Sequence, residues 1–310
     1  MCAGASRRTV ALSVAAAVAL GQATCPTVAG EDAACPSATG RHEHFTVFAP
    51  QLGRWKQVWT HLPPGYHCDP RRRFPVFYFN DGHDLFDWSP FAAGLDPALA
   101  AEIAAREGWY GSWRLDAQLD AAVAEDRLPP MIVVGVGADD GWRSSDLAPV
   151  PWIGSSDARG TDYARFLAET LVPLADGRYR TIADRGCRGV GGASMGGISA
   201  LQVGLGHADR FGAVLALSPV LGDPALATYF AEAWAAGEAA PSAFLIDFDD
   251  DPLGRIDRDW FGTELVATTP PGRRLALVQT PGGRHAIASW ARRVVTGMEV
   301  LSRAGWCRAP

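Results

Sequence analysis

The spacing of apolar and polar positions along the chain predicts alternating strands and helices. Unbroken apolar runs, which are typical of strands buried on both faces, occupy 74–79 and 131–136. Further strands are predicted at 213–217, 243–248 and 275–280. Stretches with helical spacing occupy 93–109, 115–125, 160–174, 198–205 and 286–303. Nearer the N-terminus, 44–50 and 54–62 alternate apolar and polar residues around a short turn, which predicts an antiparallel hairpin. The pattern therefore predicts an α/β fold, with a mostly parallel central sheet, helices on both faces and an N-terminal hairpin.

One Gly-rich segment stands between a predicted strand and a predicted helix. It reads Gly192-Ala193-Ser194-Met195-Gly196, which is the G-x-S-x-G pattern of a nucleophile elbow. Such a turn is sharp enough to strain the serine backbone and expose its hydroxyl, and glycines on both sides let strand and helix pass closely. We therefore predict that Ser194 is a nucleophile.

A serine hydroxyl needs a base, and the base needs an orienting carboxylate. His285 follows the last predicted strand, after Gly282-Gly283, and is the predicted base. The acid is expected after the strand at 243–248, where the chain reads Asp249-Asp250-Asp251. We predict Asp251, because Pro252 then leads the chain away from the sheet. Asp250 and Asp257 are alternatives, in that order, and a solvated acidic loop or a calcium site would also explain the run.

The tetrahedral intermediate of such a reaction needs two backbone N–H donors. The residue after the nucleophile, Met195, supplies one, and we predict that His83, beside the flexible Gly82, supplies the other. Loops that follow strands carry further polar and aromatic side chains. Of these, Arg143, Trp142 and Trp88 are predicted to contact substrate, and Arg143 is the residue suited to hold a carboxylate.

The first 29 residues are predicted to be an export signal, and 30–310 a single domain. Positive charge at Arg7-Arg8 precedes an apolar run at 10–20 that is too short to span a bilayer comfortably. Cleavage is expected near Ala23 or Ala29, and an uncleaved anchor is the alternative. The pair Arg7-Arg8 also permits a twin-arginine signal.

Net charge and cysteine content bear on the partners of the chain and on its disulfides. The net charge of -6 gives no indication of a nucleic-acid partner. Of the six cysteines, four would remain after cleavage near Ala29, which permits two disulfides in three possible pairings, or free buried thiols. These four are Cys35, Cys68, Cys187 and Cys307.

Taken together, the motifs resemble the putative-esterase family of α/β hydrolases. That family includes enterochelin esterases, S-formylglutathione hydrolases, feruloyl and acetylxylan esterases, and mycolyltransferases. The resemblance runs from His44 to the C-terminal helix and is carried by these segments: Leu62-Pro63-Pro64-Gly65-Tyr66, Phe74-Pro75-Val76-Phe77-Tyr78, Asp81-Gly82, Arg143, the elbow through Gly197, Leu217-Ser218-Pro219, and His285 with Trp290.

The resemblance implies an α/β-hydrolase fold and a serine esterase in which Ser194 is the nucleophile, His285 the base and the Met195 and His83 amides the oxyanion hole. The chain departs from the family at the acid, because Asp249 stands where the family usually has glycine. A Ser–His pair without a third member is therefore an alternative.

The sequence thus predicts a periplasmic or secreted serine carboxylic-ester hydrolase that needs no metal or organic cofactor. Its substrate would be a small-molecule or glycan ester, such as a siderophore lactone or an acylated polysaccharide. An acyltransferase with the same machinery, or a non-catalytic binding protein on the same fold, is the alternative.

Overall fold

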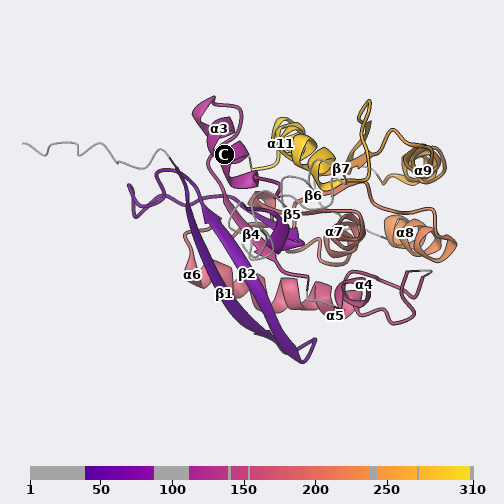
Figure 1. The fold of residues 1–310 in the computed structure, drawn as a ribbon, viewed down its shortest axis with the longest axis horizontal. Helices are drawn as coiled ribbons and strands as arrows, with labels where there is room; N and C mark the ends of the chain where they lie inside the picture. The colour runs from indigo at the N-terminus through magenta and orange to yellow at the C-terminus, as the bar shows by residue number, and fades with distance from the viewer. Residues whose placement is uncertain are drawn as a thin grey trace, which may run out of the picture. The chain divides into compact units, whose positions relative to one another are not determined.

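A mixed sheet of eight strands forms the centre of the computed structural model, which describes residues 39–86, 112–138, 141–152, 154–236, 243–270 and 272–307 (Figure 1). The strand order is β1-β2-β4-β3-β5-β6-β7-β8. β1 and β2 are antiparallel to each other, β2 is antiparallel to β4, and the remaining neighbours are parallel. This is the predicted α/β-hydrolase architecture, and all described residues belong to one compact unit, Cys35–Pro310.

The strands and helices have the following bounds. The strands are β1 Arg41–Ala49, β2 Arg54–Leu62, β3 Val76–Asn80, β4 Ile132–Val136, β5 Arg188–Ala193, β6 Ala213–Leu217, β7 Ala243–Phe248 and β8 Arg274–Gln279. The α-helices are α3 Leu115–Ala124, α4 Arg143–Asp146, α5 Gly160–Arg165, α6 Val172–Arg178, α7 Met195–Gly206, α8 Pro224–Ala236, α9 Pro252–Asp257, α10 Thr263–Thr268 and α11 Ile287–Arg303. Short 3₁₀ turns lie at η1 Gly82–Asp84 and η3 Arg185–Cys187, and π-helical turns at η2 Phe166–Leu171 and η4 Arg258–Gly262.

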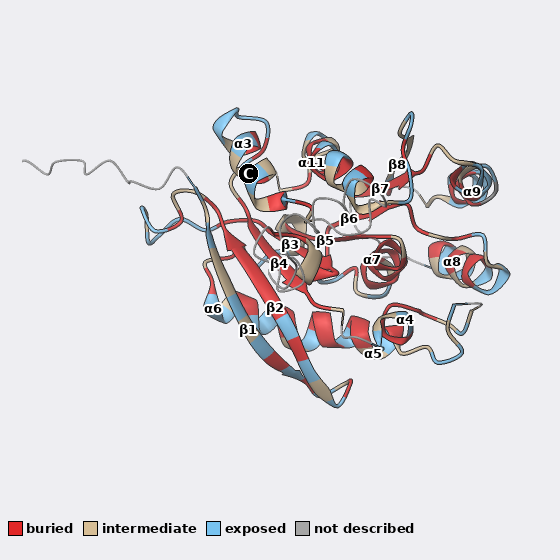
Figure 2. Ribbon diagram, in the orientation of Figure 1, coloured by how far each residue is buried: buried red, intermediate tan, exposed pale blue. Residues whose placement is uncertain are grey.

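The two faces of the sheet are covered by different helices. α3 and α11 lie on one side of the sheet, and α5, α6 and α7 on the other (Figure 1). Alternate residues of β6 follow this division: Val214 and Ala216 belong to one hydrophobic cluster, and Leu215 and Leu217 to the other. The central strands are therefore buried on both faces, as their unbroken apolar runs predict (Figure 2).

Most of the predicted elements are present, with shifted ends. The hairpin, the helices α3 and α11 and the five predicted strands are confirmed, although β8, at the edge of the sheet, has no buried residue. The helix predicted at 160–174 is longer, because α5 continues through a π-helical turn into α6 and ends at Arg178. Helices α8, α9 and α10 were not predicted. The helix predicted at 93–109 and the export signal predicted at 1–29 lie outside the described residues.

A disulfide joins Cys187, at the start of β5, to Cys307, just after α11. Cys68 is also disulfide-bonded, whereas Cys35 lies outside the described residues. In the part of the chain that the structure describes, no helix is long and apolar enough to cross a membrane.

Candidate active site

Ser194 lies in the sharp turn between β5 and α7. Its backbone has φ 57° and ψ −124°, a strained conformation for a residue with a side chain. The turn is possible because a Cβ at Gly192 would lie 2.5 Å from the backbone of Gly196. The Ser194 N–H donates to the Leu217 carbonyl of β6 at 2.9 Å, which fixes the turn against the sheet. This is the sharp strand-to-helix turn that the G-x-S-x-G pattern predicts.

His285 lies beside this serine, on the loop between β8 and α11. Its Nε2 is 2.8 Å from the Ser194 Oγ, and its Nδ1 is 3.0 Å from an oxygen of Asp249. A carboxylate can only accept a hydrogen bond, so Nδ1 carries the proton and Nε2 is free to accept one from the serine. About a third of the imidazole side chain (36%) is exposed, so the pair opens to solvent.

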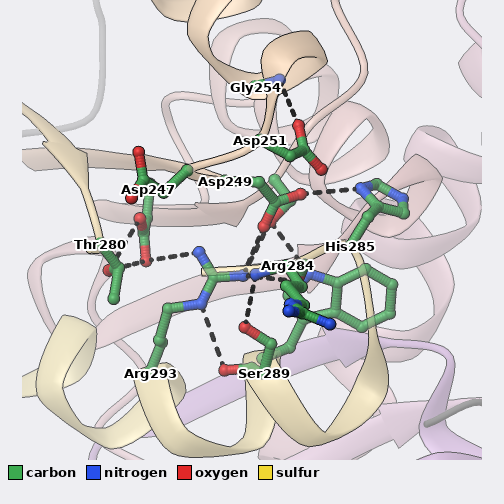
Figure 3. Close-up of polar contacts among 12 residues, drawn as sticks. Asp247, Asp249, Asp251, Gly254, Thr280, Arg284, His285, Ser289 and Arg293 are labelled. Atoms are coloured by element: carbon green, nitrogen blue, oxygen red, sulfur yellow. Dashed lines mark hydrogen bonds and ion pairs between the residues drawn. The ribbon is translucent and has the colours of Figure 1, made fainter. Parts of the chain in front are cut away.

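The carboxylate beside His285 belongs to Asp249 and not to Asp251, which was predicted from the sequence as the acid. Asp251 is the N-cap of α9, where its side chain accepts the Gly254 N–H at 2.8 Å (Figure 3). Asp250, the second choice, instead accepts from the Gly282 N–H at 3.0 Å. The signal that could have found this arrangement is Asp251-Pro252, because a carboxylate followed by proline at the first helical position is a helix start.

Asp249 is buried and held from several directions. One oxygen accepts from the Ser218 hydroxyl at 2.6 Å and from Arg293 at 2.8 Å, while the other faces His285. Burial alone would raise the pKa of Asp249. The hydrogen bonds from His285 and Ser218 and the charge of Arg293 outweigh burial and hold this pKa below its ordinary value. Asp249 is therefore a stable anionic partner for His285.

The sequence interpretation gave no role to three side chains that support this site. Trp290 donates from Nε1 to the Ser218 Oγ at 2.9 Å and packs edge-on against His285, with ring centroids 5.0 Å apart. Trp290 and Arg293 are three residues apart on α11 and so share one face of the helix. Ser218, at the end of β6, has φ 45°. A polar residue directly after a buried strand was the available signal for Ser218.

The two amides predicted to form an oxyanion hole lie at helix starts on neighbouring loops. Met195 is the first residue of α7, and His83 is in the first turn of η1, so helical geometry gives neither N–H an acceptor within its own helix. The loop after β3 is fixed to the elbow, because the Asn80 amide donates to the Gly196 carbonyl at 2.7 Å. A Cβ at Gly196 would lie 2.9 Å from Asp81, so the two loops are in close contact.

Of the residues predicted to contact substrate, Arg143 has a partner within the protein. Its guanidinium binds both oxygens of Asp81, at 2.6 and 2.8 Å. Burial would raise the pKa of Asp81, but Arg143 lowers it below its ordinary value. Trp142 is exposed at the surface, with the Arg54 guanidinium 4.7 Å from its ring centre, and Trp88 lies outside the described residues.

A pocket of about 600 Å³ opens beside His285. It lies between the loop after β6 and helix α9, and its lining includes Trp152, Pro219, Val220, Leu253, Ile256 and His285. Asp257 lies on the same wall, and burial raises its pKa to about 6. The pocket can receive an apolar group of a molecule bound at Ser194. Among the described residues, no cluster of three or more His, Cys, Asp or Glu side chains could hold a metal ion.

Comparison with known proteins identifies the family and the fold. The family model described as putative esterase matches residues 49–253. A Bacillus subtilis protein, uncharacterized protein YbbA, is 24% identical over 164 residues, which are 51% of this chain and 54% of that protein. The chain thus spans about half the length of this curated relative.

Solved structures show the same fold. An IroE-like serine hydrolase from Shewanella oneidensis has a TM-score of 0.64 at 18% identity, covering 85% of this chain and 80% of that one. A ferulic acid esterase has a TM-score of 0.60 at 19% identity, covering 86% of this chain and 99% of that one. With the family model matching most of its length, the chain belongs to the putative esterase family of α/β hydrolases.

Proposed function

We propose that the protein is an exported serine esterase that hydrolyses a carboxylic ester through an acyl-enzyme. The observation that carries this proposal is the chain of contacts from Ser194 through His285 to Asp249, at 2.8 and 3.0 Å. Three side chains from three separate loops meet in the order that nucleophile, base and orienting acid require.

The geometry supports a two-step reaction. His285 Nε2 accepts the Ser194 proton as the hydroxyl oxygen attacks the ester carbonyl, and Asp249 stabilises the imidazolium that forms. The N–H groups of Met195 and His83 stabilise the oxyanion. His285 then returns the proton to the leaving alcohol, and the same histidine activates the water that releases the acid.

The pocket beside His285 supports an ester with an apolar portion. Trp152, Val220 and Leu253 lie in its wall, and apolar contact with them would stabilise a ring or hydrocarbon chain by about 25 cal/mol for each Å² removed from water. A siderophore lactone and an aromatic ester of a polysaccharide remain candidate substrates.

Export is supported by the disulfide between Cys187 and Cys307, because disulfides persist in oxidising compartments. It agrees with the export signal expected from the first 29 residues. We therefore propose a periplasmic or secreted location.

The direct test is Ser194→Ala, with Ser144→Ala as the control because Ser144 is an exposed serine outside the triad. Ser194→Ala should lower kcat on a short-chain aryl ester by roughly 10⁵-fold or more, and Ser144→Ala should leave it unchanged. Activity of Ser194→Ala within tenfold of the wild type would reject the proposal. Product analysis with an added acceptor alcohol separates hydrolysis from acyl transfer, and a wild-type protein without turnover on a broad ester panel would indicate a binding protein.

A further inference from the structure

Arg293 is a buried arginine whose guanidinium lies between two carboxylates, Asp247 of β7 and Asp249 just after it (Figure 3). Its Nη2 donates to Asp249 at 2.8 Å, and its Nη1 forms an ion pair with Asp247 at 3.2 Å. Its Nε donates to the Ser289 carbonyl one turn earlier on α11, at 3.2 Å. The side chain is thus fixed at its base and binds both acids at its tip.

The two carboxylates need this cation because of their positions. Asp247 and Asp249 are two residues apart, at the end of one strand, so their side chains point to the same face of the sheet. Both are buried, at 3% exposure each, and two buried like charges repel. Burial raises the pKa of Asp247 even with Arg293 and the Thr280 hydroxyl beside it. Arg293 is the charge that offsets both.

We propose that Arg293 is a positioning residue that orients Asp249 toward His285 and sets the pH below which the enzyme loses activity. This inference rests on the proposed triad. Arg293 and Ser218 bind one oxygen of Asp249, which leaves the other directed at His285 Nδ1. Without Arg293, the carboxylate could rotate about its terminal torsion and the hydrogen bond to the imidazole would weaken.

The same guanidinium places a positive charge beside the oxygen of Asp249 that does not face the imidazole. A fixed positive charge on the far side of Asp249 opposes protonation of the imidazole, whereas the negative charge of Asp247 favours it. Removing Arg293 should therefore let His285 take up a proton at higher pH, which disables the base. The other charged groups near this cluster are Asp250 and Asp251 from the loop before α9, and Arg255 and Asp257 from α9. These are unchanged in the variants below.

The test is the pH profile of kcat/KM on an uncharged ester, which reports ionisations of the free enzyme. In Arg293→Met, the pH at which activity falls on the acid side of the profile should rise by about one unit. The plateau value of kcat/KM should fall by about 10- to 100-fold. Arg293→Lys keeps the charge but cannot bridge both acids, so it should restore the position of the acid side with a reduced plateau. Arg292→Met removes the same charge from an exposed neighbour on the same helix and should leave the profile unchanged.

A further variant should shift the pH profile in the opposite direction. Asp247→Asn removes the competing carboxylate and leaves Arg293 in place, so the acid side should move down by roughly half a pH unit. This measurement decides the question even where Arg293→Met fails to fold.

A folded Arg293→Met enzyme with an unshifted acid side, or an upward shift in Asp247→Asn, would overturn the proposal. Failure of the proposed function would be recognised separately, because Ser194→Ala would then retain activity. Failure of the Arg293 proposal alone would leave Ser194→Ala inactive.

Discussion

Replacing each of two nearby aspartates with asparagine distinguishes the carboxylate that orients His285 from the one that caps a helix. The pair of variants is Asp249→Asn and Asp251→Asn. Asp249 lies 3.0 Å from His285 Nδ1, whereas Asp251 accepts from the Gly254 N–H. Each substitution removes one negative charge and keeps the shape of the side chain, so each is the control for the other.

The expected loss at Asp249 follows from its contact with the imidazole. An imidazolium and a carboxylate roughly 4 Å apart attract by about 4 kcal/mol at an effective dielectric of 20, which corresponds to about 10³-fold in rate. The neutral amide can also hold the imidazole in the wrong tautomer, which brings the expected loss of kcat to about 10⁴-fold. Asparagine is as good an N-cap as aspartate, so Asp251→Asn should change kcat by less than about threefold.

The assay is steady-state hydrolysis of a short-chain aryl ester at pH 8, with thermal unfolding to confirm that both variants are folded. A further variant, Asp251→Ala, should lower the free energy of unfolding by about 1 kcal/mol while keeping activity. The reasoning is refuted by loss of activity in Asp251→Asn together with retention in Asp249→Asn. Retention within tenfold in both variants would mean that a Ser–His pair acts without an acid.

Three other predictions concern the surroundings of the site. Arg143→Met should lower kcat by about tenfold with little change in KM, because Arg143 holds Asp81 and the loop that carries the proposed oxyanion donor His83; a raised KM with unchanged kcat would instead indicate that Arg143 binds substrate. Replacing both Cys187 and Cys307 with serine should lower the free energy of unfolding by about 3–5 kcal/mol in chemical denaturation, because the bond closes a loop with a sequence separation of 120; an unchanged midpoint would contradict this. Burial raises the pKa of Asp257 from 3.8 to about 6, so the folded protein binds a proton more tightly than the unfolded chain and its stability falls as pH rises through that interval. Asp257→Asn should flatten this part of the stability profile, and profiles that stay parallel would reject the assignment.

The sequence was sufficient for the sheet because its central strands are apolar on both faces. Val76, Ile132 and Val214 are fully buried, and an unbroken apolar run of this kind is the signature of a covered parallel strand. The elbow was also predictable, because Ser194 needs glycines at both flanks to make its turn. Helices α9 and α10 lack this strong local signal, because Leu253, Ile256 and Val266 are exposed and apolar periodicity does not mark a buried face. In α8 the signal was available, since Leu226, Phe230 and Trp234 are buried at helical spacing.

The acid could not be identified from chain order alone. Asp247, Asp249, Asp250 and Asp251 all follow or end the same strand, and only their contacts distinguish them. Asp249 is assigned by the direction of His285, which comes from a loop 36 residues later. Arg143 shows the same limit, since it begins α4 and its partner Asp81 is 62 residues earlier, in the loop after β3.

Covalent labelling of the serine is the most direct test of the central claim. The purified protein would be treated with a fluorophosphonate, digested and analysed by mass spectrometry, with His285→Ala as a parallel sample. The account predicts one adduct, on the peptide containing Ser194, formed much more slowly in His285→Ala. An adduct on a different serine, or equal labelling of Ser194 in both proteins, would contradict it.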